Sequence, residues 1–387
     1  MEPVTTLTNR DIDELVAFRR ALHRFPELSN EEEETAARVA AFLADTRPDA
    51  VLTGLGGHGA AFVYDSGRPG RTILFRAELD ALPIAEISPL PHRSTIPGKG
   101  HMCGHDGHMA ILAALGRLFG RARPSSGRVV LMFQPAEETG DGAAGVTADP
   151  RYAQILPDFA FSLHNLPGTP LGHVRLREGV VNCASRGMRI VLEGREAHSS
   201  MPETGVSPMK AMSRLMPLIA ALGEGTSFPS DDFAMATVTH AHMGEPTFGV
   251  APGRAEIRVT LRTRLDDRMA ALCNHAEELA REAAAAEGLA CAIDHHEIFV
   301  ASLNDAEATA HLAAALDAEG IAHDGEQLPM RASEDFGLFG RDSKSAMLYL
   351  GAGTDRPNLH NPDYDFPDDL VPIGARIFMR VVKNLLG

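Results

Sequence analysis

Three short runs of apolar residues constrain the fold of this chain more than any other feature. They cover residues 72–75, 129–133 and 159–163, and none alternates with polar residues, which is typical of strands buried on both faces of a parallel sheet. Between the first two lies a helical apolar stripe that includes Leu112 and Leu115. Strands alternating with helices predict an α/β domain with helices on both faces of its sheet.

Two amphipathic helices are expected before these strands. In the first, Thr8 and Asp11 are spaced like a capping box, in which each side chain bonds the other residue's backbone. The second begins after Ser29 and has Glu32 three residues on, which is the same spacing.

The middle of the chain has a different pattern, in which strands alternate between apolar and polar residues. Strands and helices there follow the order βαββαβ of a ferredoxin-like unit, with strands at residues 187–194, 233–242, 254–264 and 289–297, one helix after Pro208 and another over 266–287. Beyond residue 302 the α/β pattern returns, with a helix over 305–319, a strand over 346–350 and a helix over 373–386.

A chain of 387 residues is longer than one hydrophobic core usually supports, so two domains are expected. Because the pattern changes and then returns, we predict one α/β catalytic domain in two pieces, residues 1–183 and 298–387. The ferredoxin-like domain, residues 184–297, is inserted between them.

Charge and composition exclude several classes of partner. The net charge of −16 repels phosphate backbones and anionic lipids, so neither nucleic acid nor a membrane surface is an expected partner. We find no apolar run suited to a signal peptide, nor the roughly 18 consecutive apolar residues of a membrane helix. The four cysteines are widely spaced, unlike a disulfide framework. We therefore expect a cytoplasmic enzyme.

Polar side chains follow each of the three buried strands. Glu78 and Asp80 come after the first, Glu137 and Glu138 after the second, and His164 after the third. Functional groups of open α/β sheets gather beyond the carboxyl ends of the strands. The sequence therefore predicts a site at this edge of the sheet.

A cluster of metal-binding residue types precedes the central helix. Cys103, His105, Asp106 and His108 offer a thiol, two imidazoles and a carboxylate within six residues. This mixture suits borderline divalent ions such as zinc, manganese, cobalt, nickel or iron. The adjacent pair Glu137-Glu138 adds two carboxylates, of which one can bind metal while the other handles protons.

With these residues in place, the chain resembles the metallo-amidohydrolases of the aminoacylase, hippurate hydrolase and indole-acetyl-amino-acid hydrolase group, within the larger clan of two-metal peptidases. The matching stretches run nearly from end to end: LHRFPELS at 22–29, RAELDALPI at 76–84, CGHDGH at 103–108, FQPAEE at 133–138, HNLP at 164–167, AHSSMP at 197–202, EDF at 334–336 and LHNP at 359–362.

The resemblance implies two divalent metal ions per subunit, with manganese, zinc, cobalt and nickel as candidates. The implied ligands are Cys103, His105, Glu138, His164 and His360. Cys103 would bridge the two ions through its thiolate. Glu137 would be the general base and then the acid, and Asp80 would orient a ligand imidazole.

The resemblance also assigns the inserted domain the roles of lid and dimerisation surface. The protein would form a homodimer or a tetramer, in which His198 of one subunit reaches the partner's active site and polarises the scissile carbonyl. Two positions depart from many relatives. Glu78 replaces an aspartate, and Gly249 stands where an asparagine often contacts the substrate carboxylate, so recognition of that carboxylate is expected to differ. Arg262 and the backbone amides around Gly249 are the candidates to replace that contact.

We therefore predict hydrolysis of the amide bond of a small N-acyl amino acid by metal-activated water, with a glutamate base. One alternative is a dipeptidase or carboxypeptidase with the same two-metal centre. A second alternative is a non-catalytic ligand-binding relative. It is disfavoured because the implied ligands and Glu137 are all present. A thiol redox protein using Cys103 is disfavoured because no resolving cysteine is near it in the sequence.

Overall fold

The computed structural model describes residues 6–387, which divide into two compact units. The first unit comprises the chain up to Val181 together with Leu303–Leu328 and Asp335–Gly387. The second comprises Asn182–Ser302 and Pro329–Glu334. The sequence pattern had placed this last segment in the catalytic domain. It lies with the second unit because the amide of Cys183 donates to the carbonyls of Met330 and Ala332.

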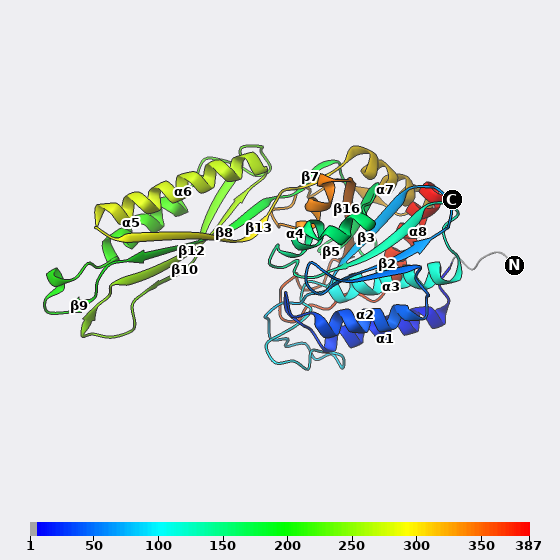
Figure 1. The fold of residues 1–387 in the computed structure, drawn as a ribbon, viewed down its shortest axis with the longest axis horizontal. Coiled ribbons are helices and arrows are strands. Elements are labelled where there is room, and N and C mark those ends of the chain that lie inside the picture. Colours follow the sequence, from blue (N-terminus) through cyan, green and yellow to red (C-terminus); the bar gives the residue numbers. More distant parts are fainter. Residues whose placement is uncertain (1–5) are drawn as a thin grey trace. The chain divides into compact units, whose positions relative to one another are not determined.

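An eight-stranded sheet forms the centre of the first unit (Figure 1). Its strands lie in the order β1 (Ala50–Leu55), β2 (Gly59–Asp65), β4 (Arg128–Gln134), β3 (Thr72–Glu78), β5 (Phe159–Pro167), β16 (Lys344–Gly353), β6 (Val174–Arg175) and β15 (His323–Asp324). The run from β4 to β16 is parallel, which confirms the predicted α/β class. β1 and β2, which were not predicted from the apolar pattern, add an antiparallel edge.

Helices cover both faces of this sheet. A layer of packed helices buries the side of Ile73, Phe75 and Ala77, and it comprises α1 (Asn9–Arg24), α2 (Glu33–Ala44), α3 (His105–Arg121), α7 (Ala306–Glu319) and α8 (Leu370–Leu386). On the other face, α4 (Gly142–Ala148) packs on β4 and on the 3-10 helix η3 (Asp335–Arg341), which also contacts β5 and β16. A second 3-10 helix, η1, spans Pro150–Gln154. The central strands are mostly apolar because both faces are buried, and their polar residues gather toward their carboxyl ends.

The ends of the first two helices test the predicted caps. In α1 the Thr8 hydroxyl accepts from the Asp11 amide at 3.2 Å, and Asp11 Oδ2 accepts from the Thr8 amide at 2.7 Å, so this capping box is confirmed. The cap expected at α2 is absent, since the helix begins at Glu33 and the Glu32 side chain makes no cap bond.

The second unit contains a four-stranded antiparallel sheet in the order β10 (Ala234–Met243), β12 (Arg254–Thr263), β8 (Ala184–Glu193) and β13 (Ala290–Phe299). Two helices, α5 (Met209–Ala220) and α6 (Asp266–Ala286), bury their apolar stripes against it. Both the element order and the sheet order are those of the predicted ferredoxin-like fold. A small ladder pairs β9 (Ala197–His198) with β11 (Val250–Ala251), and the 3-10 helix η2 spans Pro202–Thr204.

Two further short strands, β7 (Gly179–Asn182) and β14 (Ser302–Asn304), pair with each other. Among the helices of residues 6–387, none combines the length and apolar character needed to cross a membrane.

Candidate metal centre

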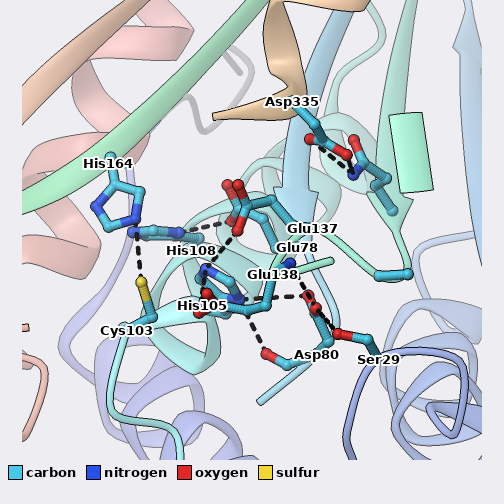
Figure 2. Close-up of polar contacts among 12 residues, drawn as sticks. Ser29, Glu78, Asp80, Cys103, His105, His108, Glu137, Glu138, His164 and Asp335 are labelled. Carbon is cyan, nitrogen blue, oxygen red and sulfur yellow. Dashed lines mark hydrogen bonds and ion pairs between the residues drawn. The ribbon is translucent and has the colours of Figure 1, made fainter. Parts of the chain in front are cut away.

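The polar residues predicted at the strand ends come together at one edge of the sheet (Figure 2). Strands β4, β3 and β5 are neighbours, so the residues at their carboxyl ends converge. Asp80 follows β3, Glu137 and Glu138 follow β4, and His164 lies within β5.

The start of helix α3 brings Cys103 and His105 to the same place. Gly104 between them has a φ of +91°, a left-handed conformation that favours glycine. A Cβ atom at this position would also lie 2.5 Å from Oδ1 of Asn165. Glycine is therefore required here both for the turn and for the close approach of β5.

The five implied ligands form two overlapping groups in which the ligand atoms lie within 4.8 Å of one another. One group is Cys103, His105 and His164, and the other is Cys103, Glu138 and His360. Cys103 belongs to both, as a side chain shared by two ions would, while a further group joins His105 and Glu138 with Glu137. Its Sγ lies 3.4 Å from Nε2 of His164.

Glu137 lies beside these groups. Its Oε2 is 3.9 Å from Nε2 of His105, and Oε1 of Glu138 is at the same distance from that nitrogen. Glu138 Oε1 is also 3.7 Å from Nε2 of His360. The adjacent carboxylates thus face a common imidazole.

Asp80 joins the centre to its surroundings. Its Oδ2 accepts hydrogen bonds from the Ser29 hydroxyl at 2.7 Å and from the Glu138 amide at 2.9 Å. Its backbone carbonyl lies 2.9 Å from Nδ1 of His105. Because a carbonyl can only accept, Nδ1 of His105 carries the proton, and Nε2 is the nitrogen turned to the site.

The buried donor atoms fit divalent metal. His105 is fully buried, and its Nε2 has no hydrogen-bond partner among residues 6–387. His164 donates from Nδ1 to the carbonyl of Asn165 at 2.9 Å, so its Nε2 is also left as an acceptor. Thiolate, imidazole and carboxylate are the donors that zinc-like ions prefer.

Burial and neighbouring charged groups shift the pKa values of these ligand groups in different directions. Burial and the neighbouring His108 lower the pKa of His164 to about 3, which keeps it in the neutral form that binds metal. Burial also lowers the pKa of His360, aided by His105. Burial and the charges of Glu138 and Glu137 raise the pKa of Cys103 well above its usual value. A bound cation reverses this effect, since it stabilises the thiolate.

Two polar residues of the predicted site, His108 and Glu78, form a pair that was not itself predicted. His108 lies one helical turn after His105, and its Nδ1 is 2.6 Å from Oε2 of Glu78. Glu78 also pairs with Arg76, which reaches Asp335. The signal for this pair was the three-residue spacing of two histidines on one helix, which puts both on the same face.

The five predicted metal ligands, Glu137 and Asp80 meet in the first unit, whereas His198, Gly249 and Arg262 belong to the second. His198 belongs to β9 of the second unit, where it is exposed and its Nδ1 lies 2.7 Å from the Ser200 hydroxyl. The carbonyl of Gly249 accepts from the Ser199 amide at 3.0 Å. Arg262 binds the carbonyl of Arg331 within its own unit.

The family model described as Peptidase family M20/M25/M40 matches residues 74–384, which is most of the chain and includes every implied metal ligand. The chain belongs to this family. As an M20-family protein it is a hydrolase that acts on amide bonds and uses divalent metal ions.

Individual relatives span almost the whole M20 chain. It is 28% identical to "IAA-amino acid hydrolase ILR1-like 5" of Arabidopsis thaliana, over 97% of this chain and 87% of the relative. It is 27% identical to "N-acetylcysteine deacetylase" of Bacillus subtilis, over 96% and 97%. Among solved structures, the Bacillus subtilis YXEP protein, described as a dinuclear metal binding peptidase from the M20 family, superposes with a TM-score of 0.78 at 25% identity, covering 98% of this chain and 99% of that one.

Proposed function

We propose that this protein hydrolyses the amide bond of small N-acyl amino acids and releases a carboxylic acid and a free amino acid. The observation that carries the proposal is the shared position of Cys103 in both ligand groups, with Glu137 directly beside them. The relatives named as an N-acetylcysteine deacetylase and an IAA-amino acid hydrolase support this substrate class.

In this proposal, two divalent ions are held by Cys103, His105, Glu138, His164 and His360, and Cys103 is the shared ligand. When bound, the ions supply Lewis acidity that activates water and polarises the substrate carbonyl. Asp80 holds the imidazole of His105 so that Nε2 faces the site.

Glu137 is the proposed general base. Its carboxylate takes a proton from the attacking water and passes it to the nitrogen of the departing amino acid, with no covalent enzyme intermediate. The transfer to nitrogen matters because an amine anion is a poor leaving group. Proton transfers of this kind contribute typically 10²- to 10⁴-fold to turnover.

We further propose that the protein acts as a homodimer in the cytoplasm and that His198 of one subunit contacts the scissile carbonyl in the other. The exposure of His198 supports this role, since its ring is accessible to another chain. Gly249 has no side chain with which to bind the substrate carboxylate, so backbone amides near it are the proposed contact.

The test begins with metal analysis of the purified protein, followed by turnover in that metal. N-acetyl, N-benzoyl and indole-acetyl amino acids are compared with free dipeptides, and a preference for dipeptides would refute the substrate assignment. Glu137→Gln should lose at least about 100-fold in kcat and keep its metal. Cys103→Ser should lose both metal and activity, and full retention of both would refute the shared-ligand role.

A further inference from the structure

The residue before the proposed base has an unusual backbone conformation. Ala136 has a φ of +49°, a left-handed conformation that residues with a Cβ seldom adopt. Strain of this kind persists only where the surrounding structure holds it in place. Because Glu137 follows directly, whatever holds Ala136 also sets the direction of the base.

The side chain of Glu32 holds this residue. Its Oε1 accepts a hydrogen bond from the Ala136 amide at 2.8 Å, although the two residues are 104 positions apart in the sequence. The same oxygen accepts from the Asn30 amide at 2.9 Å. Glu32 is fully buried, so this contact is shielded from competing water.

Glu32 is not needed to cap helix α2. The amides of Glu34 and Thr35 in the first turn instead donate to the carboxylate of Glu27, at 3.3 and 2.6 Å. A buried carboxylate is costly compared with an apolar side chain of similar size. Local helix stability therefore does not account for a glutamate at position 32.

The same segment also supports the other side of the base. The Ser29 hydroxyl binds Oδ2 of Asp80, and that oxygen accepts from the Glu138 amide (Figure 2). The loop between α1 and α2 thus supports the backbone on both sides of Glu137. It binds the Ala136 amide directly through Glu32, and the Glu138 amide through Asp80.

We infer that Glu32 is a positioning residue for Glu137: it holds the left-handed turn at Ala136 and so aims the base. This inference rests on the proposed function, because it takes Glu137 to be the base. Glu32 acts here as a hydrogen-bond acceptor, a role that a glutamine oxygen can also fill.

The experiment compares Glu32→Gln and Glu32→Met in the full chain, with Glu33→Met as the control. Glu33 is the next residue, is exposed, and starts the same helix. For Glu32→Met we expect kcat to fall about 10- to 100-fold, with KM within about twofold and metal content unchanged, since small misplacement of a catalytic group has effects of this size. Glu32→Gln should keep a kcat within about threefold of the wild-type value. The control Glu33→Met should have the same kcat as the wild type.

A double variant separates positioning from a general structural role. If Glu32 acts through Glu137, then Glu32→Met should cause no further loss of turnover in the Glu137→Gln background. Losses that multiply would overturn the inference, as would wild-type kcat in Glu32→Met or a loss of metal that matches its loss of activity. If Glu137→Gln itself keeps wild-type turnover, the proposed function fails. If only Glu137→Gln is impaired, the inference alone fails.

Discussion

Arg19 is the residue whose replacement is expected to destabilise the first unit most clearly. Its guanidinium is fully buried in α1 and pairs with Asp106 at 3.0 Å, Asp365 at 2.7 Å and Asp368 at 2.7 Å. Asp106 is itself fully buried and directly follows His105. Arg19→Met keeps much of the side-chain volume but removes the charge that compensates these carboxylates.

The expected loss of unfolding free energy in Arg19→Met follows from the carboxylates that are left without a positive partner. Removing one partner of a buried ion pair typically costs about 3–5 kcal/mol, because the other charge is left without compensation. At roughly 2–4 °C per kcal/mol for a unit of this size, the unfolding midpoint should fall by about 6–20 °C. Burial alone would raise the pKa of Asp106, but His23 and Arg19 together hold it well below its usual value. The carboxyl is therefore ionised at neutral pH.

The neighbouring residue provides a matched control. Arg20 pairs with Asp368 at 2.7 Å, but its side chain is 46% exposed. Exposed pairs contribute about 0–1 kcal/mol, so Arg20→Met should shift the midpoint little. The measurement is thermal unfolding of the metal-free proteins, followed by circular dichroism. If Arg19→Met and Arg20→Met differ by less than about 1 kcal/mol, the argument from burial is wrong.

Three further predictions concern the same unit. Burial alone would lower the pKa of His23, but the charge of Asp106 and the hydrogen bonds to Asp106 and Glu86 together raise it to about 9. The stabilisation, up to about 3 kcal/mol, should be complete below pH 6.5 and lost as the pH rises through 9, so the difference in unfolding free energy between wild type and His23→Gln should shrink over that interval. Gly104→Ala should weaken metal binding at least about tenfold in a chelator competition, because the left-handed φ and the clash with Asn165 displace the ligand loop. Wild-type affinity would show that the loop can adjust. After chelation, the Cys103 thiol should resist alkylation at pH 8, because burial and nearby carboxylates raise its pKa. Rapid labelling would contradict this.

Much of the site could be predicted because its residues follow buried strands. The positions of Asp80, Glu138 and His164 were predicted from three apolar runs, since parallel strands present their carboxyl ends at one edge of the sheet. The edge strands β1 and β2 were not predicted. β1 is largely exposed and lacks a continuous apolar pattern, although β2 is buried.

Glu32 shows where prediction from local pattern was wrong. Its spacing from Ser29 resembled a capping box, but its side chain binds Ala136 instead. Sequence spacing describes only neighbours along the chain, and here Glu27 accepts from the amides of the first helical turn while Glu32 accepts from Asn30 and Ala136. Which one caps the helix depends on what else lies within reach in the folded protein.

The sequence by itself determined the fold class and the chemistry of the centre. Hydrophobic periodicity reports whether a segment is buried on one face or two, and residue type decides which metals a donor set suits. The tertiary structure alone decided which atoms meet: that Nδ1 of His105 faces a carbonyl and leaves Nε2 for the site, and that Glu32 supports the turn before Glu137. Contacts between segments distant along the chain cannot be predicted from the periodicity of the sequence, because they depend on how the elements pack.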